Sequence, residues 1–122
     1  MQPILIVEDD ARFRTTVRSI LEDEGWAVET AADGQQAAEA FARGRPSLLV
    51  LDWGLQETDA EAVARALRAD HGPDVPILLV TADGRAAQKA ARVGAYAYMH
   101  KPFEMSELIE LVRQALDAAG QD

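Results

Sequence analysis

The sequence contains no cysteine, little positive charge and no long apolar run. Without cysteine, the 122-residue chain can form neither a disulfide nor a thiolate metal site, and it has no thiol nucleophile. Twelve lysines and arginines against 21 acidic residues give a net charge of −9, which argues against a surface that binds nucleic acid. The apolar runs are too short to span a bilayer, and no basic segment precedes one at the start. These absences predict a soluble, cytoplasmic protein.

What the sequence does contain is a regular alternation of apolar runs with segments of helical spacing. Strands are expected at 4–7, 26–30, 48–51, 77–80 and 96–99, of which 26–30 is less apolar and suits a sheet edge. Helices are expected at 11–24, 33–43, 59–69, 84–93 and 104–119. The second helix should bury Ala37, Ala38 and Phe41. Alternation with short connections builds a parallel sheet covered on both faces, so the sequence predicts one doubly wound α/β domain.

Acidic residues directly follow two of the predicted strands. Glu8, Asp9 and Asp10 follow the run at 4–7, and Asp52 follows the run at 48–51. If these strands are neighbours, Glu8, Asp9 and Asp52 converge at the edge where the carboxyl ends of the strands meet. Close carboxylates repel one another unless a cation joins them, and oxygen-only ligands suit a hard ion such as Mg²⁺. Asp10 is expected instead to cap the following helix.

Two more polar residues stand at the ends of later strands. Thr81 follows the run at 77–80, and Lys101 stands shortly after the run at 96–99. The lysine ammonium can simply balance the carboxylates, or it can bind a phosphoryl oxygen as a point charge. The threonine hydroxyl can donate a hydrogen bond to another such oxygen. Together with the acids, these groups indicate a cation and phosphoryl site.

With these motifs the chain, from about residue 3 to residue 119, resembles the receiver domain of bacterial two-component response regulators, the CheY-like family. Four ordered motifs carry the resemblance: ILIVEDD at 4–10, LLVLDW at 48–53, VTA at 80–82 and GAYAYMHKPF at 94–103. The resemblance implies a flavodoxin-like (βα)5 three-layer sandwich with a five-stranded parallel sheet of order 2-1-3-4-5. It also implies that residues 1–122 form a single receiver domain.

The resemblance implies an acceptor and a set of metal ligands. Asp52 is expected to be the phospho-acceptor, which takes a phosphoryl group from a histidine kinase. Glu8, Asp9, Asp52 and the backbone carbonyl of Gly54 are expected to bind Mg²⁺, for which Mn²⁺ can substitute. A carboxylate that attacks an anionic phosphoryl group meets strong repulsion, so positive charge at the site is what such a reaction requires.

The resemblance also implies phosphoryl ligands and a switch. Thr81, the amide of Ala82 and Lys101 are expected to bind the phosphoryl group, and the Lys101–Pro102 peptide is expected to be cis. Thr81 and Tyr98 are expected to change the surface formed by the fourth helix, the fifth strand and the fifth helix. Without the resemblance, Tyr98 would be interpreted as half-buried strand packing.

The partners implied are a sensor histidine kinase or a histidine phosphotransfer protein, and a downstream effector domain or protein. A homodimer through the switch surface is also compatible with the resemblance. Direct binding of nucleic acid or of a membrane by this domain is not expected. The domain is not expected to be an enzyme, although it should phosphorylate and dephosphorylate itself slowly.

The sequence departs from the family's pattern at four places. Gln56 replaces the usual proline, which predicts a more mobile loop after the third strand. Gly54 offers no side chain to shield an acyl phosphate, and Ala60 replaces a common glycine. Tyr96 and Ala97 replace an acidic pair that is common in the winged-helix subfamily, which argues against that subfamily's charged dimer contact.

Three alternatives remain open at this point. A receiver-like module can signal by binding alone, without phosphorylation. A phosphatase of the haloacid dehalogenase type also uses an aspartate nucleophile, but it needs a second acid two residues later, where this chain has Gly54. A flavodoxin-like cofactor binder is disfavoured, because the acidic edge would repel the phosphate of FMN.

Overall fold

The computed structural model describes residues 2–120, in which five strands alternate with five helices. Residues 1, 121 and 122, which the predicted domain of 1–122 includes, lie outside the described residues. The strands are β1 (Ile4–Val7), β2 (Val28–Ala31), β3 (Leu48–Asp52), β4 (Ile77–Thr81) and β5 (Ala97–His100). The helices are α1 (Ala11–Asp23), α2 (Gly34–Arg43), α3 (Ala60–His71), α4 (Ala86–Val93) and α5 (Met105–Ala119).

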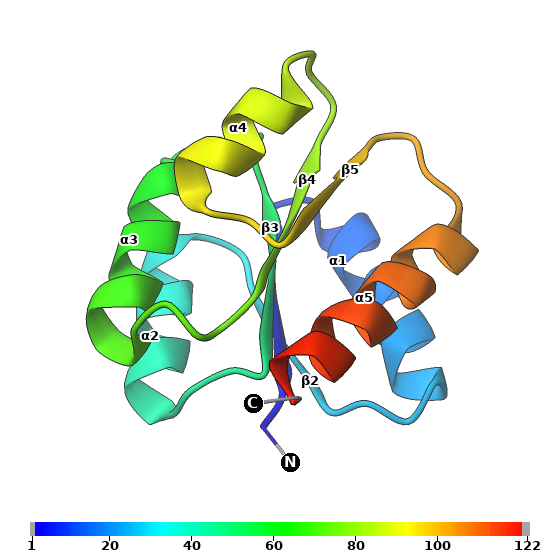
Figure 1. The fold of residues 1–122 in the computed structure, drawn as a ribbon, viewed down its shortest axis with the longest axis horizontal. Coiled ribbons are helices and arrows are strands. Elements are labelled where there is room, and N and C mark those ends of the chain that lie inside the picture. Colours follow the sequence, from blue (N-terminus) through cyan, green and yellow to red (C-terminus); the bar gives the residue numbers. More distant parts are fainter. Residues whose placement is uncertain (1, 121–122) are drawn as a thin grey trace.

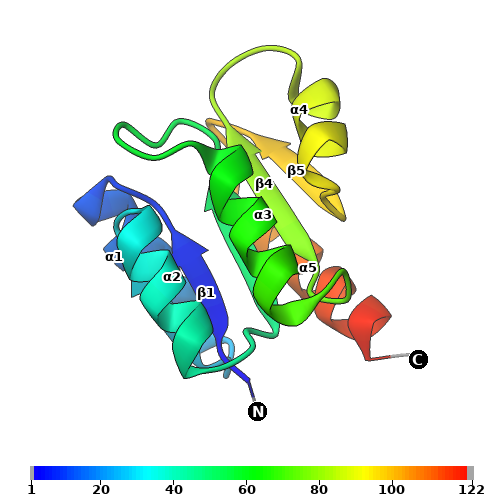
Figure 2. The same cartoon turned by 90° about the vertical axis from the view of Figure 1, so that its left-hand side faces the viewer.

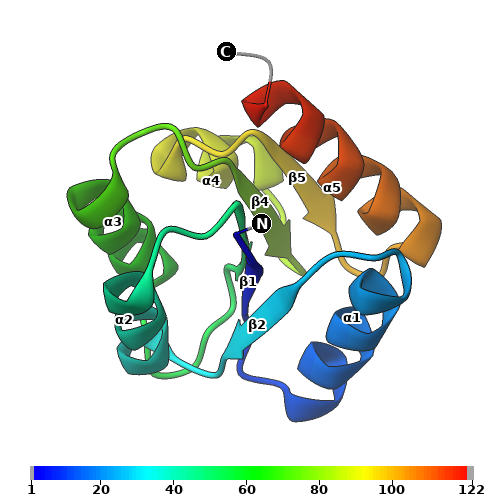
Figure 3. The same cartoon turned by 90° about the horizontal axis from the view of Figure 1, so that it is seen from below.

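All five strands form one parallel sheet in the order β2-β1-β3-β4-β5, which confirms the predicted fold class. Helices α2, α3 and α4 cover one face of the sheet, and α1 and α5 cover the other (Figure 1). Figure 2 shows α2 and α3 running side by side over their face, and Figure 3 shows α1 and α5 on the opposite side. The domain is therefore a three-layer sandwich.

The continuous apolar runs reflect burial on both faces of the sheet. Alternate residues of the central strands enter different cores, so that Leu5 and Val7 pack under α2 and α3 while Ile4 and Ile6 pack under α1 and α5. Every residue of β1, β3 and β4 is buried. A strand buried on one face would have shown polar residues at every second position instead.

The two edge strands are less buried, as their position requires. The predicted strand at 26–30 is found slightly later, as β2, and its two middle residues are only partly buried. The run at 96–99 is not a fully buried strand: in β5 only Met99 is buried, and Tyr98 is 45% exposed. Tyr96, which precedes β5, is 47% exposed. Tyrosine tolerates a partly exposed position because its ring can pack against neighbouring residues while its hydroxyl group stays in water.

Side-chain caps begin the first three helices. Asp10 accepts a hydrogen bond from the backbone amide of Phe13 at 3.0 Å, which confirms its predicted capping role. Asp33 caps α2 in the same way. Within α2 the inward residues include Ala37 and Phe41 as predicted, but Ala40 is buried where Ala38 was expected. The helix is rotated slightly relative to the predicted stripe, which places residue 38 in solvent.

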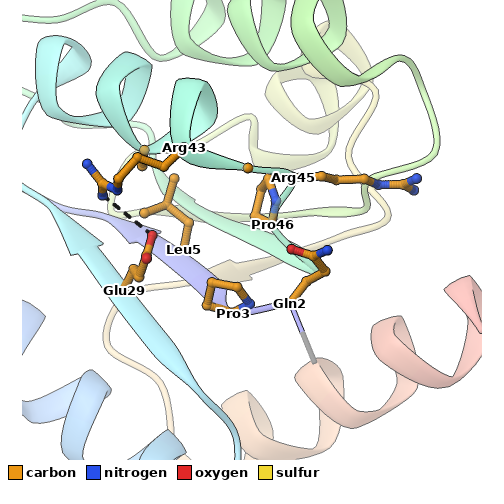
Figure 4. Close-up of a pocket in the computed structure, with 9 residues that line it drawn as sticks. Gln2, Pro3, Leu5, Glu29, Arg43, Arg45 and Pro46 are labelled. Atoms are coloured by element: carbon orange, nitrogen blue, oxygen red, sulfur yellow. Dashed lines mark ion pairs between the residues drawn. The ribbon is translucent and has the colours of Figure 1, made fainter.

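A small cavity of about 80 Å³ lies near the amino ends of β1 and β2, whereas Glu8 follows the carboxyl end of β1. Figure 4 shows the residues that line this cavity. The ion pair between Arg43 and Glu29 stands at its rim, with 3.6 Å between the charged groups. The side chains of Arg43 and Glu29 are 62% and 42% exposed, so water screens the pair and it adds little stability. Within residues 2–120, no helix combines the length and the apolar character needed to cross a membrane.

Candidate metal and phosphoryl site

The strand register brings the predicted acids together. Val7 pairs with Leu51, so the residues that follow them, Glu8 and Asp52, emerge side by side from β1 and β3. One carboxylate oxygen from each of Glu8, Asp9 and Asp52 lies within 4.8 Å of the others. Glu8 and Asp52 are buried, and Asp9 is partly exposed. The carboxyl edge of the sheet thus holds three negative groups with one side open to solvent.

Lys101 completes the cluster from the other side. Its Nζ donates a hydrogen bond to Glu8 Oε1 at 3.0 Å and lies 3.5 Å from Asp52 Oδ1. The lysine reaches this place because it directly follows β5, where its backbone amide donates to the carbonyl of Thr81 at 2.8 Å. The Lys101–Pro102 peptide is cis, as predicted.

The close packing of these charged groups shifts the pKa values of Glu8 and Lys101. Burial, a hydrogen bond to Asp52 and the negative charge of Asp52 raise the pKa of Glu8 from 4.5 to about 8, although Lys101 opposes this rise. Burial alone would lower the pKa of Lys101, but its hydrogen bond to Glu8 and the charges of Asp52 and Glu8 outweigh burial and raise it. Without an added cation, the cluster therefore favours a protonated Glu8 near neutral pH.

The cluster fits a metal ion by its donors and by one unsatisfied atom. Glu8 Oε2 is buried and accepts a hydrogen bond from no donor among the described residues. An orphaned carboxylate oxygen beside two other carboxylates costs free energy that a cation would recover. Glu8, Asp9 and Asp52 could hold such an ion through oxygen atoms alone.

Thr81, the last residue of β4, and Ala82, which directly follows it, stand next to this cluster. Asp52 pairs with Val80, so Thr81 lies one residue beyond that pair on the neighbouring strand. Thr81 is buried, and its Oγ1 accepts a hydrogen bond from the amide of Asp83 at 3.2 Å. Ala82 is exposed. Among the described residues the hydroxyl of Thr81 thus serves as an acceptor and donates no hydrogen bond.

Gly54 and Tyr98 lie at the margin of the site. A Cβ atom added to Gly54 would lie 3.8 Å from Asp52 Oδ2, so the glycine leaves the space over this carboxylate open. Tyr98 points outward from β5 and makes part of the protein surface. The structure thus brings Glu8, Asp9, Asp52 and Lys101 into one cluster, whereas Tyr98 stays apart from it.

Sequence reasoning missed a contact made by Gln56. Its backbone amide donates a hydrogen bond to Asp9 Oδ2 at 2.8 Å, which joins the loop after β3 to one of the acids. In the same loop, Thr58 Oγ1 accepts a hydrogen bond from the amide of Gly34 at 3.0 Å. The predicted gain in mobility at Gln56 stays a prediction, but the residue supplies a tether that a proline could not, because proline has no amide hydrogen.

Trp53, which directly follows Asp52, lies close to two basic side chains. The Nζ of Lys89 and the guanidinium of Arg92, both on α4, lie 5.4 Å and 5.9 Å from its ring centroid. Arg92 also pairs with Glu61 of α3 at 2.8 Å. The residue after Asp52 is therefore in contact with α4, and only the tertiary structure could reveal this.

Comparison with known proteins identifies the family. The model of the response regulator receiver domain matches residues 4–113. Response regulator MprA of Mycobacterium leprae is 41% identical over 98% of this chain and 53% of its own length. The chain thus spans about half the length of the curated relatives it matches.

Solved structures agree with this assignment. A CheY-like receiver domain protein from Methanospirillum hungatei is 26% identical with a TM-score of 0.88, over 98% of this chain and 96% of that one. Response regulator TrrA from Thermotoga maritima, solved in complex with Mg²⁺-BeF, is 30% identical with a TM-score of 0.82, over 94% and 99% of the two chains. The chain therefore belongs to the response regulator receiver domain family.

Proposed function

We propose that this chain is the phospho-acceptor switch of a two-component, histidine-to-aspartate phosphorelay, and that residues 1–122 form one receiver domain. The family match over residues 4–113 supports a single receiver domain in this part of the chain. The observation that carries the proposal is the position of Asp52, whose carboxylate lies beside two further acids and 3.5 Å from the ammonium of Lys101. A nucleophile flanked by a cation and by a set of oxygen ligands suits phosphoryl transfer.

Mg²⁺ is the ion proposed for the acidic cluster, with Mn²⁺ as a substitute. Glu8, Asp9 and Asp52 would hold it through carboxylate oxygens, and Gly54 through its backbone carbonyl. Hard oxygen donors without histidine or cysteine support this choice, as does the Mg²⁺-BeF complex of TrrA. When bound, the ion supplies positive charge that offsets the repulsion between a carboxylate and a phosphoryl group.

Asp52 is proposed as the nucleophile. One of its oxygens forms a bond to phosphorus while the P–N bond of a phosphohistidine breaks, and the electron pair of that bond remains on the nitrogen. Because the other ring nitrogen of the phosphohistidine carries a proton, the imidazole departs as a neutral group. The ammonium of Lys101, the hydroxyl of Thr81 and the amide of Ala82 would bind the oxygens of the transferred group. Because Asp52 itself is modified, the domain acts as a stoichiometric acceptor rather than as an enzyme. Self-phosphorylation by small donors and self-dephosphorylation by water would be slow.

The output would follow from the new charge on Asp52. Phosphorylation replaces the single negative charge of the Asp52 carboxylate with an acyl phosphate that carries roughly −1.5 to −2 charges on its phosphoryl oxygens, which attract the hydroxyl of Thr81. The movement of Thr81 would open space under β5 for the ring of Tyr98, which is 45% exposed at present. An inward turn of this ring would remodel the surface formed by α4, β5 and α5.

The proposed partners follow from this switch. A sensor histidine kinase or a histidine phosphotransfer protein would supply the phosphoryl group, and an effector domain or protein would bind the α4-β5-α5 surface. A homodimer through that surface is included in the proposal. The net charge of −9 supports neither direct nucleic-acid binding nor an anionic membrane as a partner. Such a function belongs in the cytoplasm, where histidine kinases have their ATP.

Acetyl phosphate with Mg²⁺ tests the proposal directly. Intact-mass spectrometry should show the addition of one phosphate to the wild type and none to Asp52→Asn, which keeps the shape of the side chain and loses the nucleophile. Chelation of the metal should abolish the addition. A wild type that stays unmodified with acetyl phosphate, phosphoramidate and a phosphohistidine donor would favour a module that signals by binding alone.

A further inference from the structure

The aromatic ring of Phe13 lies directly against the ammonium of Lys101. The Nζ of Lys101 is 4.3 Å from the centroid of the ring, well within the range of a cation–π interaction. Phe13 belongs to the first turn of α1, three residues after its cap Asp10. Phe13 lies four and eight residues before Val17 and Leu21, a spacing that is typical of the apolar stripe of a helix and by itself predicts packing alone. The structure gives its ring face a charged neighbour.

The ring of Phe13 is itself held in place. Phe103 packs against it edge to face, with 5.7 Å between the ring centroids and 89° between the ring planes. Both rings are partly buried against the core formed by β1, β3, β4, α1 and α5. The backbone amide of Phe13 is fixed by its hydrogen bond to Asp10. A ring fixed in this way presents its negative face at a constant position.

Lys101 needs such support because its other neighbours are the groups that change during the reaction. Its ammonium is held by Glu8 Oε1 at 3.0 Å and by Asp52 Oδ1 at 3.5 Å. A cation in the acidic cluster would compete for both carboxylates, and phosphorylation would modify Asp52 itself. The Phe13 ring takes part in neither event. Without it, the four-carbon stem of the lysine could adopt other rotamers.

We propose that Phe13 is a positioning residue. Its ring holds the ammonium of Lys101 beside Asp52 while Glu8 and Asp52 bind a cation and Asp52 is phosphorylated. The inference rests on the proposed phosphoryl transfer to Asp52. It assigns to Phe13 no contact with the phosphoryl group. Its effect passes through Lys101, and this separates it from an ordinary core residue.

A double-mutant cycle tests this role. Phe13→Leu keeps an apolar side chain and removes the ring face, Phe13→Tyr keeps the ring, and Lys101→Met keeps the stem and removes the charge. The rate of phosphorylation by acetyl phosphate with Mg²⁺ should fall roughly three- to tenfold in Phe13→Leu, as expected for the loss of a partly desolvated cation–π contact. Phe13→Tyr should restore most of the rate. In the Lys101→Met background, Phe13→Leu should have no further effect.

Urea unfolding of each variant shows whether the protein is folded under the conditions of the rate assay. An equal loss of rate from Phe13→Leu with and without Lys101 would assign the phenylalanine a packing role and overturn the inference. An unchanged rate in Phe13→Leu, or a failure of Phe13→Tyr to restore it, would do the same. If the wild type accepts no phosphoryl group, the proposed function fails and the inference falls with it.

Discussion

Glu8 should make the metal-free protein less stable as the pH rises through neutrality. Its side chain is 3% exposed, and burial together with the hydrogen bond and charge of Asp52 raises its pKa from 4.5 to about 8. Between these two values the folded protein keeps a proton on Glu8 that the unfolded chain has lost. Because the folded state binds more protons, the free energy of unfolding falls with rising pH across this window, until the folded state also loses the proton near pH 8.

The size of the effect follows from the shift. One pKa unit corresponds to about 1.4 kcal/mol, so a pKa near 8 in the folded state predicts a loss of about 2 kcal/mol between pH 6 and pH 8. Glu8→Gln has a similar shape but cannot ionise, so this contribution to the pH dependence should vanish. A divalent cation favours the ionised carboxylate and should reverse the loss in the wild type.

Urea unfolding followed by circular dichroism, with a chelator at pH 6 and at pH 8, measures this difference. The wild type should lose stability between the two pH values, and Glu8→Gln should lose less by about 2 kcal/mol. Mg²⁺ at pH 8 should stabilise the wild type more than the variant. Glu39→Gln, an exposed acid on α2, is the matched control and should behave as the wild type does. Equal pH dependence in the wild type and Glu8→Gln would refute the electrostatic account of the cluster.

Two further predictions concern contacts made by residues outside the cluster. Gln56→Pro removes the amide hydrogen that is donated to Asp9 Oδ2, so it should weaken the affinity for Mg²⁺ roughly two- to tenfold, as measured by titration calorimetry. Gln56→Ala keeps this amide and should leave the affinity unchanged. Equal affinities of the two variants would show that the hydrogen bond does not orient Asp9. Arg68 donates hydrogen bonds to the backbone carbonyls of residues 75, 93 and 94, and so joins α3 to the segment before β4 and to the end of α4. Arg68→Gln should therefore lower the free energy of unfolding by about 1–3 kcal/mol in urea unfolding. Arg65→Gln, an exposed change on the same helix, should cost little, and the account fails if both variants lose the same stability.

The sequence was sufficient for the parts of the fold that depend on local pattern. The runs at 4–7 and 77–80 are apolar at every position because both faces of their strands are buried. The acids and Lys101 could be predicted to converge because parallel strands bring their carboxyl ends to one edge. The pattern at 96–99 was misleading, since tyrosines satisfy both a buried strand and an exposed edge.

The sequence was insufficient where function depends on contacts between distant elements. Phe13 has the spacing of an ordinary helix core residue, and its contact with Lys101 joins residues 88 positions apart. The hydrogen bond of Gln56 comes from its backbone, which the identity of the side chain does not reveal. The rotation of α2, which buries Ala40 instead of Ala38, depends on packing against α3. Such features require the tertiary structure.

Chemical trapping of the modified residue tests the assignment of Asp52 most directly. Borohydride reduces an aspartyl phosphate to homoserine, so wild-type protein treated with acetyl phosphate and Mg²⁺, then reduced and digested, should contain homoserine at position 52. Recovery of homoserine at Asp9 or Asp83 instead, or of unmodified Asp52 in protein that has gained a phosphate by mass, would contradict the account.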